Sequence, residues 1–212
     1  MANNSSSKTL AQRRPTAAQL QKELDRLEKK RGLPVALRVI LFVIVVIIIA
    51  AITFFCLFSG YVIYGSSMIP TLEEKDLVLA IPNAALKPGD MVAFRQDDRI
   101  LVKRVVAGPG DTVEVRSDGH VLLNGHDLYE PYAIISEGGA DDMVYPLTVP
   151  ENSWFVLGDN RGNSVDSRSS IIGTIDNDQM LGKVMIRIWP LTRFQRFDEN
   201  FFSQLIYSVH AS

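Results

Sequence analysis

The hydrophobic pattern starts with an uninterrupted apolar run near the N-terminus. Positions 39–58 contain 20 residues without a charged side chain, and Thr53 is the clearly polar residue among them. As a helix that rises about 1.5 Å per residue, this run matches the roughly 30 Å hydrocarbon layer of a membrane. We therefore predict a transmembrane helix over 39–58. The alternative is the buried core helix of a soluble protein, which no other segment of this chain is long enough to wrap.

Charges on either side of this run predict its orientation. Four basic residues precede it: Lys29, Lys30, Arg31 and Arg38. No charged residue follows it before Glu73. Because the basic flank of a span stays in the cytosol, we expect 1–38 to be a basic cytosolic segment and everything after Ser59 to be extracytoplasmic. A cleaved signal peptide has a shorter apolar core and a compact segment before it, so we expect a retained, single-pass anchor in the cell membrane.

The residues before the anchor suggest no chemistry. Positions 1–16 are polar and rich in Ser and Asn, a composition typical of disorder. Leu20, Leu24 and Leu27 recur at helical spacing among charged residues and predict a short cytosolic helix over 17–31.

Beyond the anchor the pattern changes to short apolar runs separated by Pro, Gly, Asn and Asp. These runs predict strands at 77–81, 91–94, 100–107, 112–115, 121–123, 154–157 and 184–189. Asp118-Gly119 and Asn124-Gly125 are hairpin-turn signals on either side of one short strand. The sequence therefore predicts a mostly β, antiparallel domain over 59–194, with 108–150 as a candidate subsidiary lobe.

The last residues show a helical period instead. Apolar residues recur there at offsets of three and four: Phe194, Phe197, Phe201, Phe202, Leu205 and Ile206. Arg193 and Arg196 accompany them, which is typical of an amphipathic helix that lies in a membrane interface. We predict such a tail over 195–212. Packing of these side chains against the β domain is the alternative.

Charge and composition exclude several classes of function. The net charge is −2, and because 1–38 holds nine basic and three acidic side chains, the rest is acidic and unsuited to nucleic acid. The single cysteine, Cys56, excludes an internal disulfide and a C-x-x-C metal or redox site. His120, His126 and His210 form no H-E-x-x-H motif. We therefore expect neither a metal ion nor a cofactor.

Three polar stretches remain as candidates for chemistry. They are 67–72 (S-M-I-P-T-L), 103–111 (K-R-V-V-A-G-P-G-D) and 158–168 (G-D-N-R-G-N-S-V-D-S-R). Each also has an ordinary structural explanation. A serine near proline belongs to turns, a strand lysine extends to water, and an Asn- and Asp-rich stretch forms a hydrogen-bonded loop.

Lys103 is the least ordinary of these residues. Strand alternation places it on one face with Leu101 and Val105, among apolar neighbours. Burial lowers the pKa of a lysine and makes its neutral amine a usable general base. Arg104, on the other face, cannot lose its proton at accessible pH. A serine hydroxyl is a poor nucleophile without such a base, which makes Ser67 the matching candidate.

Together the three stretches resemble the bacterial, single-span type I signal peptidases. The motifs S-M-x-P-T-L, K-R-V-V-x-x-P-G-D and G-D-N-R-x-N-S-x-D-S-R follow the order of that family, and the resemblance covers the anchor and about 61–194. Pro88-Gly89-Asp90 matches a further turn of the family. The resemblance implies the signal-peptidase β fold and a membrane-anchored serine endopeptidase that cleaves signal peptides from exported preproteins after small residues, at A-x-A-like sites. Its partners would be secretory preproteins and membrane lipid, without nucleic acid.

The resemblance also implies roles for individual residues. Ser67 corresponds to the nucleophile, which forms an acyl-enzyme, and Lys103 corresponds to the general base. Ser164 corresponds to the hydroxyl that orients the lysine amine. Asp166 and Arg168 occupy the supporting acidic and basic positions of the last motif, where we expect them to act as scaffold.

Two positions depart from the family pattern. The backbone N–H of Ser67 can bind the oxyanion, but some relatives add a hydroxyl two residues earlier, where this chain has Gly65. Ser66 is therefore the candidate for the second donor. Ala107 stands where a glycine is common, and we attach no consequence to it.

A leader peptide can bind by adding a strand to an exposed sheet edge. We expect 61–66 and 99–102 to form that edge, because they lead into the two candidate catalytic residues. Eight residues separate Phe58 from Ser67, so the site should lie close to the membrane surface.

Two other functions stay open at this point. Related Ser-Lys autoproteolytic regulators share the dyad but join it to a DNA-binding or cytosolic module, and this chain has no DNA-binding motif. A non-catalytic, membrane-tethered binding or assembly module could keep the same fold. Such a module has no need of a lysine on an apolar strand face.

Overall fold

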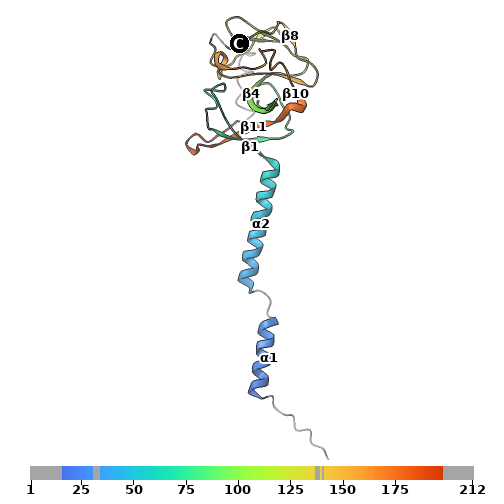
Figure 1. Cartoon of the computed structure of the whole chain (residues 1–212), viewed down its shortest axis with the longest axis vertical. Helices are drawn as coiled ribbons and strands as arrows, with labels where there is room; N and C mark the ends of the chain where they lie inside the picture. Colours follow the sequence, from blue (N-terminus) through green and yellow to red (C-terminus); the bar gives the residue numbers. More distant parts are fainter. Residues whose placement is uncertain (1–15, 31–33, 137–138, 140, 198–212) are drawn as a thin grey trace, which may run out of the picture. The chain divides into compact units, whose positions relative to one another are not determined.

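A computed structural model describes residues 16–30, 34–136, 139 and 141–197. The chain divides into two units, Met1–Ile52 and Thr53–Ser212. Helices make up the described part of the first unit, drawn blue to cyan in Figure 1, and the second unit consists mostly of strands.

Two helices precede the strands. Helix α1 (Ala17–Lys30) forms where the leucine spacing predicts it, and its three leucines are exposed. Helix α2 (Val35–Leu57) contains most of the predicted span but starts four residues earlier and ends one residue earlier. It begins directly after Pro34, which is tolerated at the start of a helix but not inside one. Arg38 therefore lies in the first turn of α2 instead of in front of it.

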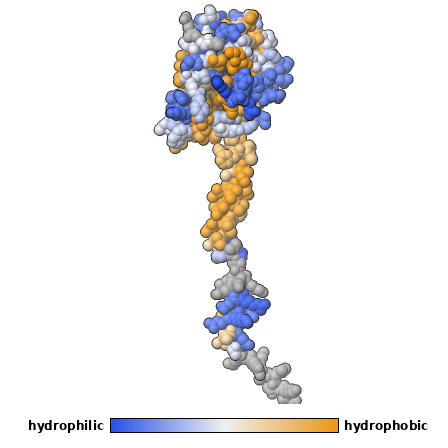
Figure 2. Space-filling view, viewed as in Figure 1, coloured by the Kyte–Doolittle hydropathy of each residue, from blue (hydrophilic) through white to orange (hydrophobic). Residues whose placement is uncertain are grey.

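The composition of α2 fits a membrane span. Its most apolar window has a mean hydropathy of 3.4, and none of its residues is buried within the described chain. Figure 2 shows this helix as a continuous hydrophobic surface. A core helix of a soluble domain would be mostly buried, so α2 does not fit that alternative.

Within the described residues the strands form two antiparallel sheets. The larger has the order β1-β2-β11-β3-β4-β9-β10, and β12 also pairs with β11. Its strands are β1 (Ser59–Val62), β2 (Leu77–Ile81), β3 (Met91–Gln96), β4 (Arg99–Ala107), β9 (Ser153–Leu157), β10 (Ile175–Asp176), β11 (Met180–Trp189) and β12 (Gln195–Arg196). The smaller has the order β7-β6-β5-β8. Its strands are β5 (Thr112–Val115), β6 (Val121–Leu123), β7 (His126–Asp127) and β8 (Leu147–Thr148). Short 3₁₀ turns connect some of them: η1 (Arg161–Asn163), η2 (Asn177–Gln179) and η3 (Leu191–Arg193).

This architecture confirms the predicted mostly β, antiparallel fold. Each predicted strand is present, with ends that shift by no more than four residues. Asp118-Gly119 and Asn124-Gly125 lie on either side of β6, and both glycines have positive φ, +87° and +81°. Strands β7, β8, β10 and β12 were not predicted, because each has only two residues, which is too few to show an alternating pattern, and β1 was expected only in part, as the start of the edge over 61–66.

Apolar packing holds the turn that follows β1. Met68 and Leu72 are buried and belong to one cluster with Val78 and Ala80 of β2 and Val184 of β11. The Leu72 N–H also donates to the Met68 carbonyl oxygen at 2.8 Å. These contacts fix the turn that carries the first candidate motif.

Strand β4 lies between two further clusters. Val106 and Ala107 pack with Phe155 and with Val113 of the smaller sheet, which joins the two sheets. Val105 packs with residues of the other cluster: Val92, Phe94, Val156 and Ile175. The second half of β4 is therefore buried on both faces, including its two cationic residues.

The helix predicted for the tail is wrong over its first residues. Gln195–Arg196 form β12, which pairs with Ile186 and Arg187 of β11. The Phe197 N–H donates to the Met185 carbonyl oxygen at 2.8 Å, and its ring packs against a core cluster, so backbone pairing replaces the helix. The alternative of packing against the β domain applies up to Phe197. The other predicted positions of the tail lie outside the described residues: Phe201, Phe202, Leu205 and Ile206.

Candidate active site

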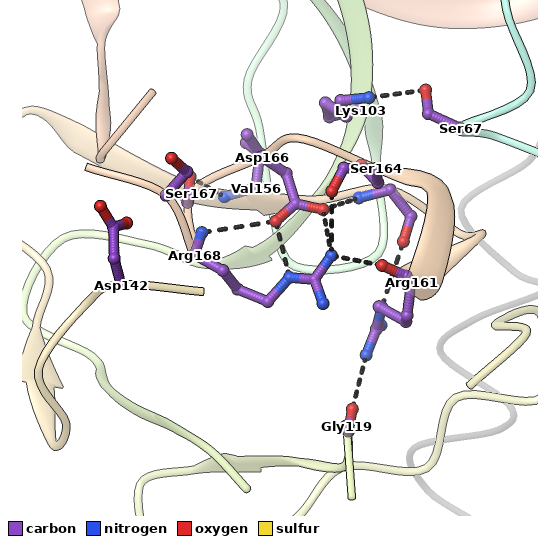
Figure 3. A network of polar contacts seen from close by, with 12 residues as sticks. Ser67, Lys103, Gly119, Asp142, Val156, Arg161, Ser164, Asp166, Ser167 and Arg168 are labelled. Carbon is purple, nitrogen blue, oxygen red and sulfur yellow. Dashed lines mark hydrogen bonds and ion pairs between the residues drawn. The ribbon is translucent and has the colours of Figure 1, made fainter. Parts of the chain in front are cut away.

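Two elements bring Ser67 and Lys103 together. Ser67 lies in the turn after β1, and Lys103 lies in the middle of β4. The Nζ atom of Lys103 is 2.6 Å from the Oγ atom of Ser67, and the two side chains point toward one another in Figure 3. This distance allows a proton to pass directly between hydroxyl and amine.

The surroundings of Lys103 favour its neutral form. Only 4% of its surface is exposed, and this burial lowers its pKa from 10.5 to about 8. The carboxylates of Asp166 and Asp159 raise the pKa, and Arg168 lowers it, but desolvation is the largest cause. About a tenth of the amines are therefore neutral at pH 7.

The Ser164 hydroxyl is buried near the nucleophile. Its Oγ atom has no hydrogen-bond partner among the described residues, so the expected bond to Lys103 is not formed and the amine bonds Ser67 instead. A Cβ atom on Gly158 would lie 2.2 Å from Ser164 Oγ and 2.7 Å from the Ser67 carbonyl oxygen. The glycine therefore allows the Ser164 hydroxyl to lie close to the Ser67 backbone. The role of Ser164 stays a prediction.

Asp166 and Arg168 form a buried ion pair in the same loop, which follows β9. Arg168 donates from Nε to Asp166 Oδ1 at 2.8 Å and from Nη2 to Oδ2 at 3.0 Å. Asp166 accepts the Gly158 N–H at 2.9 Å, and Arg168 donates to the Arg161 carbonyl oxygen at 2.7 Å. These bonds hold the loop that carries Ser164, and Figure 3 shows them converging on Asp166 and Arg168.

A second buried network joins the two candidate elements and was not predicted. Asp159 accepts from Arg104 with both carboxylate oxygens, at 2.8 and 2.6 Å, and from Thr71 Oγ1 at 2.5 Å. Arg104 is next to Lys103 on β4, and Thr71 lies in the turn that carries Ser67. One carboxylate thus ties both elements together. An arginine with apolar neighbours requires a buried anionic partner, but this signal in the sequence does not say which carboxylate supplies it.

Two asparagines of the last motif bind the serine that precedes the candidate nucleophile. Asn163 Nδ2 donates to Ser66 Oγ at 2.6 Å, and Asn160 Nδ2 donates to the Ser66 carbonyl oxygen at 3.2 Å. The Asn160 N–H donates to the Ser67 carbonyl oxygen at 3.0 Å. Gly65 has a φ of +85°, which only glycine adopts without strain. The segment 65–67 is therefore fixed by the loop and by its own backbone.

A groove of about 480 Å³ opens beside the candidate pair. One wall is the segment from Val62 to Met68, and the other runs from Arg99 to Lys103 on β4. Among the described strands, β1 pairs with β2 alone, and β4 pairs with β9 from Arg104 onward. Val62 at the end of β1 and the first half of β4 therefore offer strand edges that no described strand covers, whereas 63–66 form no strand, so the edge expected over 61–66 is present only in its first two residues.

Comparisons with known proteins give the family. Residues 36–189 match the family described as "Signal peptidase, peptidase S26". The chain is 33% identical over 168 residues to signal peptidase I S of Bacillus subtilis (strain 168). The alignment covers 73% of this chain and 89% of that protein. It is 33% identical over 159 residues to signal peptidase IB of Staphylococcus aureus (strain Mu50 / ATCC 700699), covering 65% and 81%.

A solved structure is similar over part of the chain. The crystal structure of a signal peptidase I from Enterococcus faecalis V583 shows 31% identity and a TM-score of 0.41, and covers 47% of this chain and 97% of its own. The family match extends over most of the chain, from α2 to the end of β11. The chain therefore belongs to the signal peptidase family, peptidase S26, and is a serine peptidase of the signal peptidase I type.

Proposed function

We propose that this signal peptidase works through a Ser67–Lys103 dyad. Family membership makes it a membrane-anchored serine peptidase that removes signal peptides from preproteins. The proposal assigns Ser67 as the nucleophile and Lys103 as the general base. The observation that carries it is the 2.6 Å distance between Ser67 Oγ and the Nζ of a buried lysine.

Each step of the reaction moves one proton through this amine. Neutral Lys103 takes the hydroxyl proton while Ser67 Oγ attacks the scissile carbonyl carbon. The lysine ammonium then gives that proton to the departing amine, which breaks the peptide bond and leaves an acyl-enzyme. Lys103 next takes a proton from water, whose oxygen attacks the ester, and returns it to Ser67 as the leader is released.

The oxyanion of each tetrahedral intermediate needs hydrogen-bond donors. We assign the Ser67 N–H as one donor and the Ser66 hydroxyl as the second. Ser66 Oγ already accepts a bond from Asn163, so its own hydrogen is available for donation. One such donor lowers the barrier by roughly 3 to 4 kcal/mol.

Three further residues support the dyad in this proposal. The Ser164 hydroxyl is the group that orients the Lys103 amine once substrate occupies Ser67. Its buried oxygen is unsatisfied among the described residues, which is costly unless a bond forms during the reaction. Asp166 and Arg168 hold the Ser164 loop through their ion pair and act as scaffold.

The groove beside the dyad is the proposed site of the leader. An extended peptide would add as a strand between the open edges of 61–66 and 99–102, with alternate side chains facing the enzyme. The Ile63 N–H and C=O are bonded to Asp76 and Lys75, which leaves the alternate backbone groups of this wall for a peptide. The proposed cleavage after small residues requires shallow pockets beside Ser67 that take the alternate side chains of this peptide.

The proposed topology is a single pass with an extracytoplasmic catalytic domain. It comprises a cytosolic segment over 1–38, the span, the catalytic domain over 59–194 and a C-terminal tail. The basic residues before α2 support this orientation. Membrane lipid is then a partner through α2, and nucleic acid is not.

Cleavage of a preprotein tests the dyad directly. The full-length protein in detergent micelles should cut a precursor with an A-x-A leader once, and Ser67→Ala and Lys103→Arg should both lose activity. Lys103→Arg keeps the positive charge but has no neutral form. An intact precursor with the wild-type protein would support a binding module, and wild-type turnover by Lys103→Arg would contradict the general base.

A further inference from the structure

Arg99 is an exposed cation at one end of the groove. It is the first residue of β4, its side chain is exposed, and it lines the same groove as Ser67 and Lys103. It forms no hydrogen bond or ion pair with any side chain that the structure describes. A guanidinium in this position is free to interact with whatever occupies the groove.

No acidic residue of the described chain lines this groove. Its remaining lining is apolar or neutral: Val62, Ile63, Tyr64, Gly65, Met68, Ile100, Leu101 and Val102. Asp97 and Asp98 precede Arg99 in the β3–β4 turn but do not line the groove. Among the described residues that line the groove, Arg99 therefore supplies the charge at the end away from Lys103.

The distance along β4 indicates which part of a leader reaches Arg99. Lys103 is four positions after Arg99, which at about 3.3 Å per strand residue corresponds to roughly 13 Å. A peptide added to this edge has the same rise. If its scissile bond lies at Ser67, its fifth residue before the cut lies beside Arg99. Residues an even number apart share a face, so the first, third and fifth residues point the same way.

We propose that Arg99 selects the charge of the leader about five residues before the cleaved bond, favouring an acidic side chain there and disfavouring a basic one. This inference rests on the proposed binding of the leader in the groove. The interaction is a partly exposed ion pair, so its effect is modest and decreases with salt. It acts on binding of the leader and leaves the chemistry at Ser67 unchanged.

A charge-swap experiment tests this selection. Precursors with Glu, Gln or Lys at the fifth residue before the cut are compared with the full-length enzyme in uncharged detergent. For the wild type, kcat/KM should be about fivefold higher with Glu than with Lys, and Arg99→Glu should reverse the order. The preference should shrink when the salt concentration is raised from 50 to 500 mM, because the Debye length then falls about threefold.

Arg95→Glu provides the matched control. Arg95 is an exposed residue of β3 that does not line the groove, and its substitution changes the net charge equally. It should leave the Glu-to-Lys ratio as in the wild type. An unchanged ratio in Arg99→Glu would overturn the proposal, and so would equal shifts in both variants, which would indicate a long-range charge effect.

The same peptides separate this inference from the dyad. Binding of the Glu and Lys leaders to Ser67→Ala reports the Arg99 preference without catalysis. Cleavage retained by Ser67→Ala, with the charge preference preserved in binding, would contradict the dyad only. Normal cleavage by the wild type, with no preference in either assay, would contradict the role of Arg99 only.

Discussion

Gly65 illustrates how backbone conformation limits the chemistry at a single residue. It lies two residues before Ser67 and has a φ of +85°, with no atom within 4 Å of the place where a Cβ would be. Space is thus available for a side chain, but the left-handed backbone disfavours one. The missing hydroxyl is therefore explained by the turn itself, and the second oxyanion donor has to come from elsewhere.

Substituting Gly65→Ser tests this explanation. The variant should be less stable by about 1 kcal/mol and should not turn over faster than the wild type. Gly60→Ser is the control, because a Cβ there meets only ordinary contacts, 3.7 Å from Leu79 at the nearest, and its φ is not in the left-handed region. Thermal unfolding and kcat of both variants are the measurements that test this explanation. Faster turnover of Gly65→Ser would show that its hydroxyl serves as the donor.

At the scale of elements, β4 carries both cations of the site. Lys103, the proposed base, lines the groove, while Arg104 is buried and held by Asp159 from the loop after β9. Arg104 also stacks on Tyr132, with 4.1 Å between its Cζ atom and the ring centroid. The strand and the loop are therefore held together by a buried ion pair. Loss of either partner would leave the other charge buried without compensation.

Removing one partner of this ion pair should strongly destabilise the fold. Asp159→Ala leaves the Arg104 guanidinium buried and uncompensated, which should lower the free energy of unfolding by roughly 3 to 5 kcal/mol. The double variant Asp159→Leu with Arg104→Met removes both charges and should lose clearly less. Urea unfolding of the full-length protein measures both. Equal losses in the two variants would contradict a cost that arises from the unpaired charge.

Sequence patterns predicted the long elements, and the proximity of Ser67 to Lys103, better than the connections. The apolar run, the alternation in β4 and the turn dipeptides around β6 all report local periods, so the elements that they predict are present. Asp159 and Asn163 could not be placed in advance, because their contacts join residues 88 and 97 positions apart. The helix predicted for the start of the tail was wrong, because these residues pair with β11. The helical period of the tail's own sequence does not show this pairing.

At the scale of the whole molecule, we propose that the basic residues around the start of α2 determine the membrane topology. Lys29 and Lys30 end α1, Arg31 follows it, and Arg38 lies in the first turn of α2, which has no other charge. The β domain follows this helix after one residue, since β1 starts at Ser59. The orientation of α2 therefore decides on which side of the membrane the peptidase acts.

Neutralising these basic residues should disturb the orientation. The variant replaces four basic residues by Gln: Lys29, Lys30, Arg31 and Arg38. In a substantial fraction of its molecules, the catalytic domain should lie in the cytosol. Protease accessibility of the N-terminus in spheroplasts measures that fraction. Replacing Glu23, Asp25 and Glu28 by Gln is the control, because acidic residues contribute little to orientation. An orientation unchanged by loss of the basic residues would contradict the proposed topology.

The pH dependence of kcat/KM tests the central claim most directly. Catalysis requires neutral Lys103, and burial places its pKa at about 8, so the neutral fraction rises as pH increases through that value. The account predicts that kcat/KM of the full-length enzyme rises about tenfold per unit below pH 8 and levels off above it. A flat profile between about pH 5 and 9 would show that no base titrates in this range, contrary to a neutral lysine activating Ser67.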